Sequence, residues 1–183
     1  MKIKNIAVFC GSSNGIHPAY QSAAVEMATT MANWQCDLIY GGGAVGLMGI
    51  IADEMMRLGR SVTGIIPRKI YDWEVGHENI TQLLVVADMH ERKAKMASIS
   101  DAFIAMPGGI GTLEEIIEAF TWLQLEYHQK PCAFLNVNGY YDHLIRFLDH
   151  SVTEGFLKEK HRANLIISNS PKELLPKLVT QST

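Results

Sequence analysis

The stretch "DAFIAMPGGIGTLEEIIEAF", residues 101–120, passes from an apolar run through a glycine turn into a segment with helical periodicity. The apolar run 102–106 has the length and composition of a buried strand. Three glycines, Gly108, Gly109 and Gly111, then occupy four positions before the predicted helix 112–127 begins. A strand that turns directly into a helix is the repeating unit of α/β proteins, so this stretch predicts the fold class.

The same alternation of short apolar runs and helical segments continues along the chain, with a predicted surface loop at 67–81 that can overhang a site. It predicts a doubly wound, Rossmann-like α/β fold, with helices on both faces of a parallel sheet and one nucleotide-binding domain over 1–183. The predicted strands are 5–9, 37–40, 61–66, 82–86, 102–106, 132–137 and 165–167. The predicted helices are 18–34, 46–58, 89–98, 112–127, 140–154 and 171–180.

Composition narrows the possible partners and location. Charged residues make up 19% of the chain and the net charge is -3, which argues against a nucleic-acid partner. The first apolar run is too short for a signal peptide, and no run approaches the roughly 18 residues of a membrane span. We therefore expect a cytoplasmic protein.

Cysteine and histidine spacing argues against a metal site. Cys10, Cys36 and Cys132 lie far apart in apolar runs, which predicts buried reduced thiols. The seven histidines show no ligand spacing such as HExxH. We expect no bound metal.

Three glycine turns, 10–15, 41–49 and 107–112, each follow a predicted strand. Ligands of open α/β sheets bind beyond the carboxyl ends of the strands, and helix N-termini there favour phosphate. Tight packing between strand and helix explains any one such turn equally well. Three turns at one sheet edge favour a phosphate-bearing ligand.

The second turn formally contains a dinucleotide fingerprint, GxGxxG, at Gly41, Gly43 and Gly46. The acidic residue expected at the end of the next strand is replaced by Pro67, Arg68 and Lys69. Because these cations suit a 2′-phosphate, an NADP-dependent enzyme remains an alternative. No GK[ST] follows any glycine turn, which disfavours P-loop chemistry.

Two groups of charged residues accompany the turns. Thr112 and Glu115 have the spacing of a capping box, although the same position places the carboxylate beside any ligand held by the glycine turn. Arg92, Lys93 and Lys95 stand near the start of the helix 89–98, where cations are unfavourable unless an anion compensates them. A solvated helix face with local Glu–Lys pairs is the alternative.

Together these residues resemble the LOG, or Lonely Guy, family of cytokinin riboside 5′-monophosphate phosphoribohydrolases, many of them first labelled lysine decarboxylases. The resemblance rests on "MHERK" at 89–93, "PGGIGTLEE" at 107–115 and "YGGGAVGLMG" at 40–49. It implies hydrolysis of the N-glycosidic bond of an N6-modified adenosine 5′-monophosphate. The base, adenine or an N6-prenylated adenine, stays open.

The resemblance also implies roles for individual residues. Arg92 and Glu115 match the catalytic pair. The expected substrate-binding residues are Gly108, Gly109, Ile110, Gly111 and Thr112 of the turn, together with Glu74, Lys93, Thr121, Gly42 and Gly43.

A carboxylate such as Glu115 suits this reaction because it stabilises an oxocarbenium-like transition state and activates water. Hydrolysis needs no cofactor, and we expect none. The lysine decarboxylase label has no support, since a glycine turn supplies neither a Schiff-base lysine nor a pyridinium partner. A non-catalytic nucleotide carrier is the other alternative to a hydrolase.

A homodimer is the expected assembly. The helix 112–127 carries apolar residues around more than the single stripe that packing on a sheet requires. A helix sandwiched within one domain is the alternative. The resemblance implies a homodimer with the substrate site near the interface and completed by the second subunit.

Overall fold

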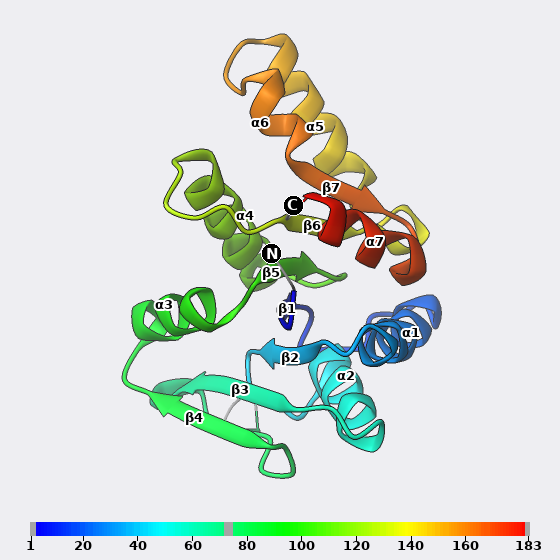
Figure 1. Ribbon diagram of the computed structural model, residues 1–183, viewed down its shortest axis with the longest axis vertical. Coiled ribbons are helices and arrows are strands. Elements are labelled where there is room, and N and C mark those ends of the chain that lie inside the picture. The colour runs from blue at the N-terminus through cyan, green and yellow to red at the C-terminus, as the bar shows by residue number, and fades with distance from the viewer. Residues whose placement is uncertain (1–2, 72–74, 182–183) are drawn as a thin grey trace.

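The computed structural model describes residues 3–71 and 75–181 and confirms the doubly wound, Rossmann-like α/β fold. Seven parallel strands form one sheet in the order β4-β3-β2-β1-β5-β6-β7 (Figure 1). The strands are β1 Asn5–Phe9, β2 Asp37–Tyr40, β3 Val62–Pro67, β4 Gln82–Val86, β5 Ala102–Ala105, β6 Cys132–Leu135 and β7 Leu165–Ser168.

Helices cover both faces of the sheet, as predicted. They are α1 Ala19–Asn33, α2 Gly46–Arg57, α3 Met89–Ile99, α4 Ile110–Gln124, α5 Asp142–Thr153, α6 Glu159–Ala163 and α7 Pro171–Gln181, with the short 3-10 helices η1 Arg68–Ile70 and η2 Val137–Gly139. One apolar core lies between the sheet and α1, α2 and α7, and a second lies between the sheet and α3, α4 and α5. Figure 1 shows α1, α2 and α7 to the right of the sheet and α3 and α4 to the left.

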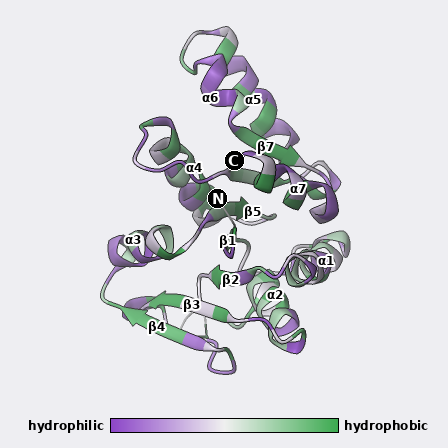
Figure 2. Ribbon diagram, viewed as in Figure 1, coloured by the Kyte–Doolittle hydropathy of each residue, from purple (hydrophilic) through white to green (hydrophobic). Residues whose placement is uncertain are grey.

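The strands are apolar along their length because side chains on both of their faces are buried. Ile6 and Val8 of β1 point into the first core, and Ala7 and Phe9 point into the second. Figure 2 shows β3, β4 and β7 predominantly hydrophobic and the peripheral α6 largely hydrophilic. This pattern explains why the strands read as continuous apolar runs in the sequence.

Strand order places the ligand crevice. The chain adds strands on one side of β1 up to β4 and then returns to the other side with β5, so the order reverses between β1 and β5. Phe9 pairs with Ala105, so the two strands end side by side. A reversal of this kind leaves room for a ligand beyond the strand ends.

Most sequence-based boundaries agree with the structure within one or two residues. Helix α4 begins at Ile110, two residues before the predicted start, because its N-cap is Gly109, which has no side chain to mark the boundary. Helix α6 was not predicted, since its five residues, four of them polar, are too few to show a helical period. The predicted loop 67–81 contains η1 and an isolated antiparallel bridge between Gly43 and Gly76. Within the described ranges, the helices lack the combination of length and apolar character that crossing a bilayer requires.

Candidate active site

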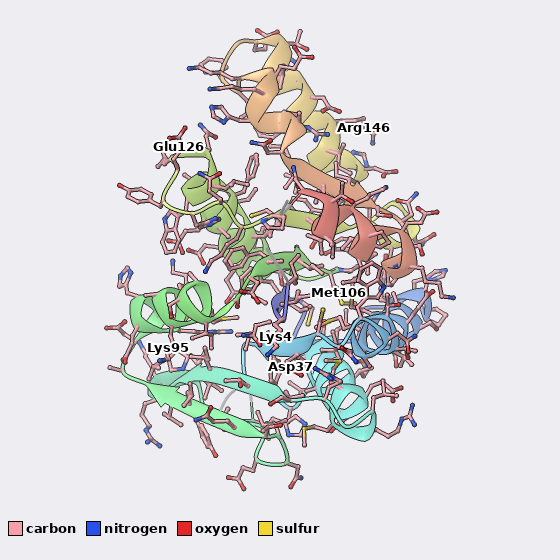
Figure 3. The ribbon with its side chains drawn as sticks, viewed as in Figure 1. Lys4, Asp37, Lys95, Met106, Glu126 and Arg146 are labelled. Carbon is pink, nitrogen blue, oxygen red and sulfur yellow. The ribbon has the colours of Figure 1, made fainter. Side chains whose placement is uncertain are left out.

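A cavity of about 370 Å³ opens at the carboxyl ends of β1 and β5, at the point where the strand order reverses. Met106, labelled in Figure 3, directly follows β5 and leads into the glycine turn. The volume lies in the range of small-molecule sites. The residues that line the cavity are Val8, Phe9, Cys10, Gly11, Ser12, Gly41, Met48, Ile70, Met89, Arg92, Gly109, Ile110, Gly111, Thr112, Glu114 and Glu115.

The three glycine turns interlock around this cavity. The N–H of Gly11 donates to the carbonyl of Pro107 at 3.0 Å, and the N–H of Leu47 donates to the carbonyl of Gly11 at 3.1 Å. Gly46 has a positive φ of 63°, and a Cβ there would collide with the backbone of Ser12 and Ser13. The glycine spacing in the second turn therefore has a packing explanation that needs no dinucleotide.

The turn before α4 and the first residues of that helix, Gly109 to Thr112, line the cavity. Gly109 is the N-cap residue, and a Cβ on either Gly109 or Gly111 would meet no atom within 4 Å. The first N–H groups of a helix have no partner within the helix and carry partial positive charge. Gly108 is required for a different reason, because a Cβ there would collide with Thr112 Oγ1. The glycines of this turn therefore have two separate structural roles, close packing at Gly108 and an open approach at Gly109 and Gly111.

The capping-box interpretation of Thr112 and Glu115 is wrong. Because α4 begins at Ile110, Thr112 lies inside the first turn of the helix and not at its N-cap. Its side chain is buried against Gly108. Glu115 is therefore not a capping residue of α4.

Glu115 forms an ion pair with Arg92 across the two helices. The distance from Arg92 Nη2 to Glu115 Oε1 is 3.3 Å, and the two side chains are only 6% and 10% exposed. The guanidinium lies against Gly41, where a Cβ would collide with Nη2. Arg92 Nε is buried without a hydrogen-bond partner among the described residues. The structure thus brings the predicted catalytic pair together on the cavity wall, with one donor still unused.

Lys93, the next residue, takes a different direction. Its Nζ lies 2.6 Å from Glu114 Oε1 and 3.0 Å from Glu118 Oε1, and the side chain is not among those that line the cavity. Burial alone would lower the pKa of Lys93, but the hydrogen bonds to the two glutamates outweigh it and raise that pKa. Carboxylates of α4 therefore supply the compensating anions for the cations of α3. Lys95 is exposed (Figure 3).

Two carboxylates that accept backbone N–H groups at the start of α3 were missed in the sequence. Asp88 is the N-cap and accepts the N–H of Glu91 at 2.9 Å, while Glu91 Oε2 accepts the N–H of Ala87 at 2.8 Å. The signal was present, because Asp88 and Glu91 have the capping-box spacing.

Other expected substrate-binding residues lie away from the cavity in this chain. The carbonyl of Gly42 accepts the N–H of His77 at 2.9 Å, and Gly43 bridges to Gly76, so both hold the loop after η1. Thr121 is exposed and donates to the carbonyl of Ile117, about 16 Å along the helix axis from Ile110. Glu74 falls outside the described residues.

Several residues that line the cavity were not singled out in the sequence. Met48 and Met89 lie within the recognised motifs 40–49 and 89–93, and Cys10 and Ser12 belong to the first glycine turn. Ile70 ends η1, at the start of the loop that was predicted to overhang a site. Their positions in or beside a motif were visible in the sequence, but the sequence alone does not show which of these residues contact the cavity.

Solved structures with the same fold include proteins named for the molybdenum cofactor. The molybdenum cofactor binding protein of Rippkaea orientalis matches with a TM-score of 0.75 at 22% identity, covering 100% of this chain and 99% of that one. The Moco carrier protein of Chlamydomonas reinhardtii matches with a TM-score of 0.68 at 18% identity, covering 98% and 97%. At these identities the likeness shows the fold alone.

Sequence relatives are much closer. A family described as "Possible lysine decarboxylase" matches residues 48–178. LOG1 and LOG7 of Arabidopsis thaliana, both cytokinin riboside 5′-monophosphate phosphoribohydrolases, are 49% and 47% identical to this chain over 177 residues. The aligned region covers 97% of this chain and 83% and 82% of theirs. With this similarity along nearly its whole length, the chain belongs to the LOG family of cytokinin riboside 5′-monophosphate phosphoribohydrolases.

Proposed function

We propose that this protein hydrolyses the N-glycosidic bond of N6-modified adenosine 5′-monophosphates, releasing the free base and ribose 5-phosphate. The observation that carries the proposal is the buried Arg92–Glu115 pair on the wall of a cavity that also reaches the glycine turn of α4. A phosphate at that turn places the rest of a nucleotide beside the pair. Relatives named for this activity are 46–49% identical to the chain.

Glu115 is the residue we assign to the chemistry at the sugar. Hydrolysis breaks the bond between C1′ and the base nitrogen. The bonding electrons leave with the base, which takes up a proton, and water adds its oxygen to C1′. The transition state carries positive charge on the ribose ring, which a nearby carboxylate stabilises while it orients or deprotonates the water.

Arg92 supports this role in two ways. Its guanidinium is a permanent cation, and its contact with Glu115 orients that carboxylate. Its Nε, which has no partner among the described residues, is a donor for an anionic oxygen of the ligand. We therefore assign Arg92 to phosphate binding and electrostatic stabilisation, not to proton transfer.

Apolar side chains at the cavity favour a base that bears an apolar N6 substituent. Ile70, Met89 and Ile110 all line the cavity, and Ile110 is 82% exposed. An isoprenoid group on N6 would cover such surface and gain about 25 cal/mol for each Å² of apolar area removed from water.

The family description as a possible lysine decarboxylase does not fit the cavity. Pyridoxal phosphate chemistry needs a lysine that forms a Schiff base. The described residues that line the cavity include no lysine. The nearby Lys93 is held by Glu114 and Glu118.

We further propose that the active form is a homodimer in which Thr121 of one subunit serves the site of the other. Leu125 and Tyr127, at the end of α4, are 59% and 78% exposed. They continue a surface that includes Trp122 and a groove of about 630 Å³ between α3 and the end of α4. Exposed aromatic and aliphatic side chains gathered on one surface are typical of an interface. Thr121 lies on the same exposed stretch, which supports a contribution to a neighbouring subunit.

The test is incubation of the purified protein with AMP and with N6-isopentenyl-AMP, without added metal or cofactor, followed by chromatography for free base. We expect base release from both nucleotides and faster release from the prenylated one. Intact nucleotide in both reactions would contradict the proposal and favour a carrier protein.

A further inference from the structure

Every carbonyl of the glycine turn from Met106 to Gly109 accepts a hydrogen bond from within the protein. The donors are the Tyr141 hydroxyl to Met106 O at 2.6 Å, the Gly11 N–H to Pro107 O at 3.0 Å, the Tyr140 hydroxyl to Gly108 O at 2.5 Å and the Leu113 N–H to Gly109 O at 3.2 Å. Two of the four donors are tyrosine hydroxyls from the turn between β6 and α5. These tyrosines play no part in the proposed chemistry.

The hydrogen bond from Tyr140 fixes the orientation of the peptide group between Gly108 and Gly109, which local sterics leave free to rotate. The unit between Gly108 and Gly109 has a glycine on each side, so sterics restrain its rotation less than that of any other peptide in the turn. In a trans peptide the C=O and the N–H point in opposite directions. A hydroxyl that holds the Gly108 carbonyl therefore directs the Gly109 N–H to the opposite side.

That opposite side is the active-site cavity. Tyr140 lines a separate cavity of about 200 Å³ behind the turn, together with Tyr20 and Leu47. Gly109 borders both cavities. With the carbonyl held behind the turn, an anion in front meets N–H groups and no carbonyl oxygen.

Tyr140 is itself held in place. Its ring packs edge-on against Tyr141, with 4.9 Å between the ring centroids, and against Tyr20 at 5.6 Å. The N–H of Tyr141 donates to Asn136 Oδ1 at 2.7 Å, which fixes the chain at this point. The hydroxyl of Tyr140 thus approaches the glycine turn from a rigid support.

Tyr141 also holds a carbonyl of the turn, but its bond does not orient an N–H group, so it serves as a control for Tyr140. It holds the carbonyl of Met106, and the next residue is Pro107, which has no N–H to direct. Burial raises the pKa of Tyr141, so its hydroxyl stays a neutral donor. Its bond anchors the end of β5 without orienting a donor toward the ligand.

We infer that Tyr140 is a positioning residue for phosphate recognition, because its hydroxyl holds the Gly108–Gly109 peptide with the N–H toward the cavity. The inference rests on the proposed function in one respect, that the ligand carries a phosphate at this turn. It adds a residue from outside the cavity to the determinants of specificity for a monophosphate over a nucleoside.

The experiment compares Tyr140→Phe with wild type by calorimetry, using ribose 5-phosphate and adenosine as probes. We expect ribose 5-phosphate to bind about tenfold more weakly, the size of one lost hydrogen bond, and adenosine to bind within about twofold of wild type. In turnover of N6-isopentenyl-AMP, KM should rise about tenfold while kcat changes by less than about threefold.

Two control variants separate this role from a general effect. Tyr20→Phe removes a hydroxyl from the same aromatic cluster that does not hold the turn, and it should leave both affinities unchanged. Tyr141→Phe should lower the melting temperature but keep the ratio of the two affinities.

Equal weakening of both probes in Tyr140→Phe, or unchanged binding of ribose 5-phosphate, would overturn the inference. Failure of the wild-type protein to bind ribose 5-phosphate would also overturn it. Binding of ribose 5-phosphate without base release would contradict only the proposed function, and the comparison of affinities would still decide the role of Tyr140.

Discussion

Arg92 and Glu115 are buried charges that depend on each other. Arg92 is 5% exposed as a whole residue, on a helix whose other buried residue is Met96. A buried ion pair adds little net stability, but loss of one partner leaves an uncompensated charge and costs about 3–5 kcal/mol. A pair retained at the wall of a cavity is therefore better explained by chemistry than by stability.

The first prediction at this scale concerns Glu115→Gln. The amide keeps the size of the side chain and a hydrogen-bond acceptor for Arg92 but removes the negative charge. We expect kcat for N6-isopentenyl-AMP to fall at least about a hundredfold while the nucleotide still binds. Steady-state kinetics, calorimetry and a melting curve check this result. A rate near that of wild type in a folded variant would mean that Glu115 is not catalytic.

The second prediction concerns Arg92→Ala. If the guanidinium binds phosphate, the affinity for AMP should fall far more than the affinity for adenosine, by at least about tenfold in their ratio. Arg146→Ala is the control, because Arg146 is an exposed arginine of α5 (Figure 3). Equal losses for AMP and adenosine would remove the phosphate role.

At the scale of elements, the site depends on how α3 packs beside α4. Helix α3 is polar and buries few side chains, so hydrophobic contact alone does not fix its position. Lys93 joins it to α4 through two carboxylates, and Asp88 caps its start. These contacts set the distance between Arg92 on one helix and Glu115 on the other.

The prediction at this scale concerns Lys93→Met, which keeps an apolar stem and leaves Glu114 and Glu118 without their shared cation. We expect the free energy of unfolding to fall by about 1–2 kcal/mol at neutral pH. Because folding raises the pKa of Lys93, its stabilisation is complete below the ordinary lysine pKa of about 10.4 and is lost as pH rises through the higher folded value.

Urea unfolding of wild type and of Lys93→Met, at neutral pH and at about pH 11, checks this expectation. The difference in stability between wild type and Lys93→Met should shrink at the higher pH. Lys95→Met, on the exposed side of α3, is the control and should change stability little at either pH. A difference that stays constant with pH would show that the charge of Lys93 does not hold the helices together.

At the scale of the whole molecule, the two ends of α4 have different roles in the proposed dimer. The start of α4 borders the cavity of its own chain, while Thr121 near the other end is exposed. In a symmetric dimer both subunits use the same surface, and we expect Thr121 of each subunit to lie near the site of the other.

The prediction at this scale is complementation between two inactive variants, Glu115→Gln and Thr121→Arg. In a mixed dimer, one site receives both defects and the other receives neither. Random mixing after unfolding and refolding should therefore restore about a quarter of wild-type activity. If the mixture is as inactive as its components, Thr121 does not act across an interface. Size-exclusion chromatography of the mixture establishes that dimers are present.

The sequence by itself determined the fold class and the positions of most elements. The bounds of β1, β2 and β4 match the prediction, since a buried strand shows its apolar run in neighbouring residues. The motifs likewise predicted Arg92 and Glu115 as a catalytic pair, because short spacing patterns are local in the chain, and the structure brings the two side chains within 3.3 Å of each other. The start of α4 was placed two residues late, since a glycine N-cap has no side chain to mark it.

Tertiary structure decided which of these residues meet. The sequence placed Arg92 and Lys93 together as ligand contacts, yet successive helical residues point about 100° apart, so one reaches Glu115 and the other Glu114 and Glu118. The bond from Tyr140 to Gly108 joins residues 32 positions apart. Such contacts depend on strand order and helix packing, which arise from long-range burial and leave no periodic trace in the chain.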